Sequence, residues 1–351
     1  MSPSPRQHTS PLANLSPAYF SMVMATGILS VGAWRLDFPQ LAYALFGLNV
    51  AIYALLWVLY VWRLLRYPRQ FIASLFDHVT GMGFFTMVAA TGILGSQCLL
   101  LIDAMNVAVA LLILAIALWL ALTYSIFTAF TIKDDKPPLD KGINGAWLLA
   151  VVASQAIAAL SAQLAAHSGH DYVRELNFLT LSMWLFGGML YIWMMSLIFY
   201  RYTFFELRPS DLSPPYWINM GAMAISTLVG AQLGLNAASA PLLHSLLPFI
   251  KGFTVFYWAT GTWWIPMLVV LGFWRHVYKR YPLRYEPLYW GSVFPVGMYA
   301  TGTWEMSRMM DLPFLRPVTY VMFVAALVAW TALFVGQLRE LWRHRHGALK
   351  A

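Results

Sequence analysis

The chain has 351 residues, of which 60% are apolar and only 10% carry a formal charge. Soluble globular proteins carry about 25% charged residues, so this composition argues against a water-soluble enzyme and against a nucleic-acid-binding protein. A bilayer crossing needs about 20 apolar residues, and the chain supplies enough of them for about ten crossings. The single cysteine, Cys98, rules out an intrachain disulfide, and we expect it to be a small buried filler.

Charged residues and prolines divide the chain into apolar blocks of membrane-spanning length. We therefore predict an all-α integral membrane protein with ten transmembrane helices, forming a single transmembrane domain over residues 1–351. The predicted spans cover residues 17–34, 39–62, 75–96, 104–130, 143–165, 176–200, 214–235, 245–274, 287–305 and 317–338. The first block lacks a small-residue cleavage site, so we expect a retained helix rather than a signal peptide.

The distribution of basic residues predicts the orientation in the membrane, because cytoplasmic loops retain Lys and Arg. With ten spans, 17 of the 22 lysines and arginines fall in segments on the same side as the N-terminus. Four fall on the opposite side, and Lys251 lies within a span. We expect a multi-pass protein of a bacterial inner membrane with both termini in the cytoplasm. The net charge of +8 then reflects topology, and no nucleic-acid partner is needed to explain it.

Polar residues concentrate in the odd-numbered spans, whereas the even-numbered spans are more strongly apolar. Lipid offers no hydrogen-bond partners, so polar groups at membrane depth face protein or a wet cavity. This pattern predicts an inner group of odd helices around a pathway and an outer group of even helices facing lipid. The pore-lining candidates are Thr26, Gly27, Thr91, Gly92, Ser226, Thr227, Ser292 and Thr301.

An internal repeat links the first and third spans. Residues 22–30 and 87–95 are identical at seven of nine positions and lie 65 residues apart. This repeat indicates that a helical hairpin is the building unit, and transporters and channels are often built from such repeats. The alternative is that the two helices only share a small-residue packing motif.

Ionisable side chains are absent from the middle of every predicted span. The sequence therefore predicts no catalytic cluster, no metal site and no cofactor. Asp77 and Lys251 are candidates for charges at the two mouths of the pathway, although an interfacial anchor or a salt bridge is the more common role for such residues. Glu305 and Arg308, three residues apart, are expected to pair.

The ninth span contains a proline that should disturb its helix. Pro295 lacks an N–H for the carbonyl of Gly291, so we predict a kink at these two residues. Phe294 stands directly before the proline. A bulky ring beside a kink can close a narrow pore by filling and dewetting it, although phenylalanine is also a common packing residue in every span.

Three motifs give the chain a resemblance to a known family. They are residues 17–30 followed by Phe38-Pro39, residues 258–266 (Trp-Ala-Thr-Gly-Thr-Trp-Trp-Ile-Pro), and residues 290–299 (Trp-Gly-Ser-Val-Phe-Pro-Val-Gly-Met-Tyr). With them the chain resembles the tellurite-resistance/C4-dicarboxylate transporter family over nearly its whole length. That family includes bacterial tellurite-resistance membrane proteins, fungal malate permeases and sulfite efflux pumps, and plant slow anion channels. Ala25 departs from the family pattern, where many members carry glycine.

The resemblance implies five hairpins in quasi-fivefold order, a central pore lined by odd helices, and homotrimers with one pore per subunit. It also implies that Phe294 occludes the pore as a gate. The expected substrates are small anions, among them malate and other C4-dicarboxylates, sulfite, chloride, nitrate and tellurite. We expect a channel or uniporter and not an enzyme.

Three alternatives stay open. A proton-coupled dicarboxylate carrier could use Asp77 or His78 at the inner mouth. A membrane-embedded enzyme and a receptor-like scaffold are more remote.

Overall fold

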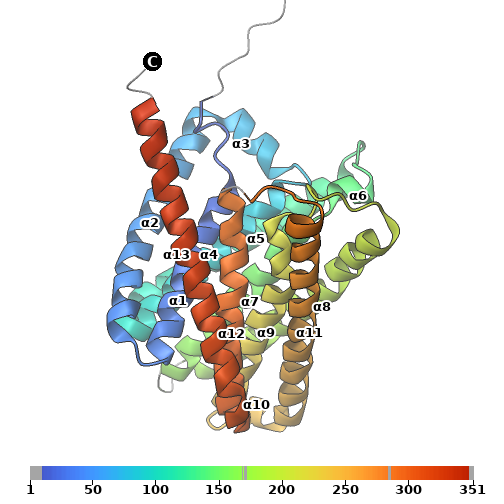
Figure 1. The fold of residues 1–351 in the computed structure, drawn as a ribbon. Coiled ribbons are helices and arrows are strands. Elements are labelled where there is room, and N and C mark those ends of the chain that lie inside the picture. The colour runs from blue at the N-terminus through green and yellow to red at the C-terminus, as the bar shows by residue number, and fades with distance from the viewer. Residues whose placement is uncertain (1–9, 168, 170–171, 284–285, 348–351) are drawn as a thin grey trace, which may run out of the picture.

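The computed structural model describes residues 10–167, 169, 172–283 and 286–347. Arg6, Arg284 and Lys350, which contribute to the predicted orientation, lie outside the described residues. In the described part of the chain all regular structure is helical, as predicted (Figure 1). The long helices are α1 (Phe20–Arg35), α2 (Pro39–Arg66), α4 (Phe85–Ile102), α5 (Met105–Ile132), α7 (Leu149–His167), α8 (Val173–Phe204), α9 (Ile218–Asn236), α11 (Leu247–Phe273), α12 (Trp290–Met310) and α13 (Arg316–Gly347).

Of the helices that the structure describes, nine are long and apolar enough to cross a membrane. The tenth long helix, α12, has sufficient length at 21 residues but a more polar sequence. It contains Glu305 and Arg308 together with Pro295, which is the composition expected of a helix shielded from lipid by its neighbours.

The described helices overlap all ten predicted spans, and their ends differ most in the third span and in α13, which continues to Gly347. Residues 75–80 belong to the end of the short helix α3 (Pro68–Leu75) and to a turn, and the spanning segment runs over Gly81–Ile102. The short helices α6 (Leu139–Gly142) and α10 (Pro241–Ser245) were not predicted either. All three short helices lie in connections, where apolar periodicity extends over too few residues to be read.

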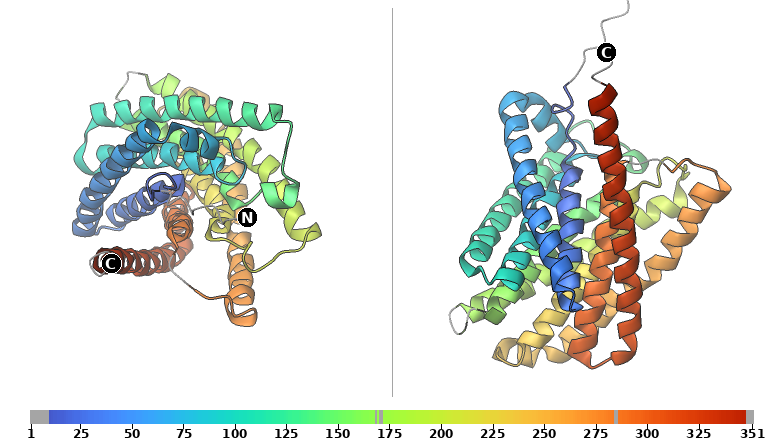
Figure 2. Two further views of the ribbon diagram at one scale, coloured as in Figure 1. Left: turned by 90° about the horizontal axis from the view of Figure 1, so that it is seen from above. Right: turned by 60° about the vertical axis from the view of Figure 1, so that its left-hand side comes forward.

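The long helices form an inner and an outer group, as the alternation of polar and greasy spans predicts. The spans of α1, α4, α7 and α9 are 83 to 100% buried, whereas those of α2, α5, α8, α11 and α13 are 17 to 56% buried. Most residues of α12 are buried as well. Each inner helix packs against the next, α1–α4–α7–α9–α12, and α12 returns to α1. Each also packs against the outer helix that follows it, so five hairpins form a closed ring (Figure 2).

Every inner helix begins with a 3-10 turn. The five turns are η1 (Pro17–Tyr19), η2 (Gly81–Phe84), η3 (Gly145–Leu148), η4 (Pro214–Trp217) and η6 (Pro287–Tyr289). Ser16 and Asn144 cap two of them by accepting hydrogen bonds from the backbone N–H of Ala18 (3.3 Å) and Ala146 (2.8 Å). The turns contact one another in ring order, which gathers five helix N-termini at one end of the molecule.

Arginines at the ends of three outer helices anchor that arrangement. Arg63 Nε donates to the carbonyl of Ala13 (3.1 Å), and Arg201 Nε donates to that of Asp140 (2.8 Å).

Arg275, which follows α11 in the π-helical segment η5 (Trp274–Tyr278), donates through Nη1 to the carbonyl of Leu212 (2.5 Å). In each case the acceptor lies just before an inner helix. We call this end of the molecule the basic end and the opposite end the far end. The end of α13 lies at the basic end (Figure 1).

Candidate functional site

A cavity of about 280 Å³ lies at the basic end, on the axis of the inner ring. All five inner-helix starts contribute to its walls, and we call it the vestibule. It is lined by Ser16, Ala18, Ser21, Val79, Thr80, Gly83, Asn144, Ala146, Leu149, Ser213, Pro215, Ile218, Leu288 and Gly291.

The vestibule favours negative ions by its backbone rather than by ionised side chains. None of the residues that line it carries a charge, and five of them offer hydroxyl or amide groups. A helix N-terminus bears roughly half a positive charge, and its free N–H groups bind anions. Five such termini around one cavity add their fields there.

Asp77 lies next to this cavity but its carboxylate serves the local turn. Oδ1 accepts hydrogen bonds from the backbone N–H of Val79 (3.0 Å) and of Thr80 (2.9 Å), both of which line the vestibule. A short Asp side chain bonded to its own backbone is a common turn device. The carboxylate therefore positions the wall of the vestibule.

His78 is packed as an aromatic ring. It stacks on Phe130 with the ring centroids 4.1 Å apart, and its carbonyl accepts a hydrogen bond from the indole of Trp147 (3.1 Å). Burial, and then the positive charge of Lys133, lower the pKa of His78. The imidazole is therefore neutral at pH 7, as a packing role requires.

The orientation of α12 follows from its contacts with the two neighbouring inner helices. A Cβ on Gly221 of α9 would lie 2.7 Å from Pro295 Cγ, so Pro295 faces α9. A Cβ on Gly297 would lie 3.0 Å from Ile28 of α1, so Gly297 faces α1. The surface between these two contact lines carries Gly291, which lines the vestibule, and Phe294 one turn deeper. Phe294 is 1% exposed.

Contacts of α1 identify the residues opposite Phe294 in the same way. Thr26 faces the outer helix α13, because its hydroxyl accepts a hydrogen bond from the indole of Trp330 (2.9 Å). Ser21, which lines the vestibule, lies on the other side of α1, with Met24 and Ile28 further along that side. On α1 and α12 the faces that continue beyond the vestibule are therefore apolar, and Met24, Ile28 and Phe294 are buried.

The structure directs most of the predicted hydroxyls away from the vestibule. Thr91 bonds Tyr53 of the outer helix α2 (2.8 Å). Ser226 and Thr227 donate to carbonyls of their own helix, at Ala222 and Met223.

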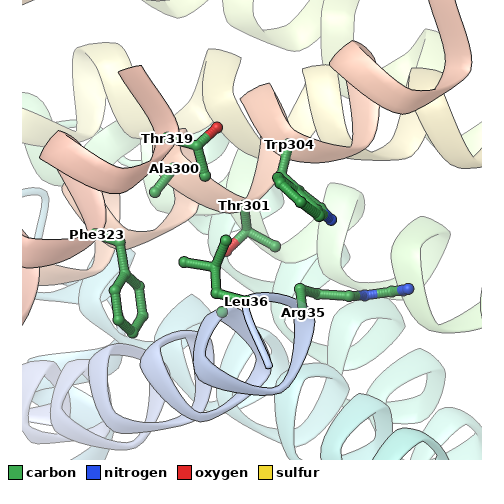
Figure 3. A pocket seen from close by; sticks show the side chains of 8 residues that line it. Arg35, Leu36, Ala300, Thr301, Trp304, Thr319 and Phe323 are labelled. Atoms are coloured by element: carbon green, nitrogen blue, oxygen red, sulfur yellow. The ribbon is translucent and has the colours of Figure 1, made fainter. Parts of the chain in front are cut away.

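Ser292 and Thr301 likewise bond within or next to α12. Ser292 Oγ donates to the Tyr289 carbonyl (2.7 Å), and Thr301 Oγ1 donates to that of Gly297 (3.1 Å). Thr301 lies in a crevice between α1, α12 and α13, beside Arg35 and Trp304 (Figure 3). The pore-lining role of these hydroxyls stays a prediction.

The two glycines of the internal repeat make close helix contacts. A Cβ on Gly27 would lie 2.5 Å from Ile93 of α4, and one on Gly92 would lie 3.0 Å from the carbonyl oxygen of Ala156 in α7. Each glycine therefore faces the next inner helix of the ring, so the repeat places equivalent packing positions in two successive hairpins. Gly291 differs, because a Cβ there would meet nothing within 4 Å.

The far end carries a second polar group of inner-helix residues. Arg35 Nε lies 2.9 Å from Glu305 Oε1, and Arg308 Nη1 lies 3.3 Å from Glu305 Oε2, so the predicted Glu305–Arg308 pair forms. Gln163 and Gln232 are 6% exposed, and among the described residues their side-chain oxygens have no hydrogen-bond partner. We call Arg35, Gln163, Gln232 and Glu305 the far-end ring.

A constant spacing in the sequence relates the far-end ring to the vestibule, and the polarity of the spans alone did not reveal it. Its members stand 14 residues after Ser21, Leu149, Ile218 and Gly291 of the vestibule. Fourteen residues make about four helical turns, so each pair lies on one face of its helix, roughly 21 Å apart.

Lys251 lies outside this arrangement. It is exposed near the start of the outer helix α11, at the far end. Its predicted role at a pathway mouth stays a prediction.

Comparison with known proteins agrees with this architecture. Residues 14–338 match the family model described as a voltage-dependent anion channel, SLAC1. An uncharacterized membrane protein of Mycobacterium tuberculosis is 41% identical over 152 residues, which cover 43% of this chain and 77% of that protein.

Two further relatives match nearly the full length. An uncharacterized transporter of Methanocaldococcus jannaschii is 21% identical, covering 94% of this chain and 96% of its own. A sulfite efflux pump of Trichophyton rubrum is 25% identical, covering 92% and 90%. The chain is therefore a multi-pass membrane protein that belongs to the SLAC1 voltage-dependent anion channel family, a family of anion transporters and channels rather than enzymes.

Proposed function

We propose that this protein is a channel or uniporter for small anions, with an uncharged pathway along the axis of the inner ring and Phe294 as its gate. The observation that carries the proposal is the vestibule, where five helix N-termini meet around a cavity without a charged lining residue. Such a cavity attracts anions without binding them as tightly as a buried cation would, so an ion that enters can also leave.

Phe294 supports the gate by its position. It lies one turn beyond Gly291 on the same face of α12, between the vestibule and the far-end ring, and its ring is buried. An anion that leaves the vestibule along the axis would meet this ring first. Apolar constrictions of this kind close a pathway by excluding water.

Small inorganic anions are the proposed substrates, with sulfite, chloride and nitrate as the first to test. The relative from Trichophyton rubrum carries the name of a sulfite efflux pump, which favours an oxyanion of this size. Malate, other C4-dicarboxylates and tellurite are the further candidates. The resemblance also makes a homotrimer with one pathway per subunit part of the proposal.

Flux of radiolabelled anions into proteoliposomes tests the transport function. We expect uptake of at least one of sulfite, chloride and nitrate above that of protein-free liposomes. Uptake at the protein-free level for every candidate anion would contradict the proposal.

The variant Phe294→Ala tests the gate. Removing the phenyl ring takes away the apolar constriction and lowers the free-energy barrier that the anion crosses. A decrease of ~1.4 kcal/mol in that barrier raises the rate about tenfold. We expect at least a tenfold increase in anion flux or single-channel conductance. Wild-type flux from correctly inserted Phe294→Ala protein would argue against the gate.

The variant Gly291→Leu tests the vestibule independently. A Cβ at this position meets nothing within 4 Å and Gly291 lines the cavity, so we expect a leucine side chain to extend into the cavity and reduce its volume. We expect the variant to insert normally and to lose its flux. Gly47→Leu is the matched control, because a Cβ on Gly47 in the outer helix α2 is equally free of neighbours and should leave flux unchanged.

A further inference from the structure

A second cavity, of about 250 Å³, lies at the basic end between α9, α11 and the start of α12. Arg275, His276 and Ser292 provide polar groups in its wall, and Leu268, Gly272 and Leu283 provide apolar ones. It is separate from the vestibule, although the two cavities share Ser213 as a wall residue and the neighbouring residues Gly291 and Ser292 of α12 each line one of them. We call it the Arg275 cavity.

Arg275 is buried, at 5% exposure, yet its hydrogen-bonding capacity is only partly used. Nη1 donates to the Leu212 carbonyl, and the guanidinium carbon lies 4.5 Å from the ring centroid of Tyr281. Nε is buried and has no partner among the described residues. An unpaired buried donor on a charged group is costly, so a ligand that accepts from it would be stabilised.

Arg201, which has the same role in another hairpin, differs from Arg275 in how its donors are used. Arg201 uses Nε toward the carbonyl of Asp140, and its Nη2 lies 3.8 Å from the carboxylate of Asp211. Arg275 has no carboxylate within 4 Å in the part of the chain that the structure describes. Its charge is therefore uncompensated where that of Arg201 is balanced.

The surroundings define the charge and shape of the missing partner. No acidic side chain lines the Arg275 cavity, and Lys279 and Arg280 follow in the next turn of the chain. Glu286, the nearby acid, is exposed. A guanidinium presents a planar fork that matches the oxygens of a phosphate group. The apolar wall and the position at the end of a lipid-facing helix also suit the phosphate of a membrane lipid, with its acyl chains along α11.

We propose that the Arg275 cavity binds a phosphate group, held by the guanidinium of Arg275, whose Nε has no partner among the described residues. The two sources of such a group are free inorganic phosphate and an anionic phospholipid. Arg275 and Gly272 line this cavity and not the vestibule, so the proposed site is distinct from the pathway proposed above and does not depend on it.

The experiment measures thermal unfolding of the purified full-length protein in neutral detergent with four additions. These are inorganic phosphate, chloride at the same ionic strength, phosphatidylglycerol, and diacylglycerol with the same acyl chains. We expect phosphate or phosphatidylglycerol to raise Tm, and chloride and diacylglycerol to leave it unchanged. A rise with phosphatidylglycerol alone assigns the site to lipid, and a rise with both assigns it to the phosphate group itself.

Gly272→Leu and Gly252→Leu provide matched variants on α11. A Cβ at either position meets nothing within 4 Å, but only Gly272 lines the Arg275 cavity. Gly272→Leu fills the cavity while leaving the Arg275–Leu212 hydrogen bond in place. We expect Gly272→Leu to weaken phosphate or phosphatidylglycerol binding about tenfold or more. We expect the same of Arg275→Lys, because lysine keeps the positive charge but lacks the planar guanidinium that can donate two parallel hydrogen bonds.

Gly252→Leu and Gly291→Leu should retain the Tm rise, because neither substitution enters this cavity. The proposal is overturned if no addition raises Tm, if diacylglycerol does so as well as phosphatidylglycerol, or if Gly272→Leu retains the full rise. A protein that shows no flux but keeps this pattern would contradict the transport proposal and leave this one intact.

Discussion

Thr26 illustrates how a polar residue at membrane depth can be satisfied without water. Its hydroxyl accepts from the indole of Trp330, and both side chains are buried. We predict that Thr26→Val lowers the free energy of unfolding by about 1–3 kcal/mol, because the Trp330 N–H is left without an acceptor. Thermal unfolding in detergent measures the loss.

The flux of the same variant tests the assignment of this face of α1. In a Phe294→Ala background, Thr26→Val should keep its flux per inserted protein, whereas Ser21→Ala, which changes the vestibule wall, should lower it. If Thr26→Val lost as much flux as Ser21→Ala, the result would indicate that the Thr26 hydroxyl contacts the anion in the pathway.

The charges of the far-end ring predict opposite changes in anion current when Arg35 and Glu305 are neutralised. Glu305 pairs with Arg35 at 2.9 Å and with Arg308 at 3.3 Å, so Glu305→Gln leaves two arginines without their carboxylate, whereas Arg35→Gln removes one positive charge from the ring. We predict that in the Phe294→Ala background Glu305→Gln raises the anion current and Arg35→Gln lowers it. Each change should be about fivefold or more, since ~1 kcal/mol corresponds to a factor of about five. Equal changes in both variants would show that the pair only supports the fold.

At the scale of helices, the sequence identifies which segments cross the membrane and which of them are inner. Runs of apolar residues ending in arginine predicted α2, α8 and α11, and the gathering of hydroxyls and amides predicted the inner group. α12 was included because the ten-span count, with this segment as one crossing, places 17 of the 22 lysines and arginines on one side.

The rotation of each inner helix about its axis could not be predicted from polarity alone. Thr26 and Thr91 look like lining residues, but aromatic donors or acceptors on outer helices satisfy them, and nothing in the sequence pairs Trp330 with a residue 304 positions away. Gln163 and Gln232 were not predicted to lie on the inner face. Each stands on the same helix face as a vestibule residue, Leu149 or Ile218, and this could be recognised only after those two residues were known to line the vestibule.

The packing of α9 against α12 gives a prediction about the element that carries the proposed gate. A Cβ on Gly221 would lie 2.7 Å from the ring of Pro295, a part of α12 that cannot change rotamer to make room. We predict that Gly221→Ala destabilises the protein by about 1–3 kcal/mol, as overpacking does. Thermal unfolding measures this effect.

Gly47→Ala is the control for this prediction. A Cβ on Gly47 meets nothing within 4 Å, and replacing glycine by alanine within a helix stabilises it by about 0.5–1 kcal/mol. A Gly221→Ala protein as stable as Gly47→Ala would mean that α9 and α12 separate easily at this contact.

At the scale of the whole molecule, the five hairpins place five parallel inner helices with their N-termini at one end. Their dipoles add because the helices run in the same direction, and the outer arginines of that end contribute positive charge as well. From the same basic residues we propose that this end lies in the cytoplasm. In this proposed orientation the vestibule faces the side from which an inside-negative membrane potential expels anions.

This orientation gives a prediction that separates a uniporter from a proton-coupled carrier. A potential of 100 mV is worth about 2.3 kcal/mol for a monovalent anion, which corresponds to about a fifty-fold concentration ratio at equilibrium. In proteoliposomes with a potassium diffusion potential set by valinomycin, we expect the direction of anion flux to reverse with the sign of the potential. A pH gradient without a potential should produce no accumulation, since the carboxylate of Asp77 is bonded within its turn and His78 is packed as a neutral ring. Accumulation driven by the pH gradient alone, and lost in His78→Gln, would instead favour the carrier and assign the proton to that histidine.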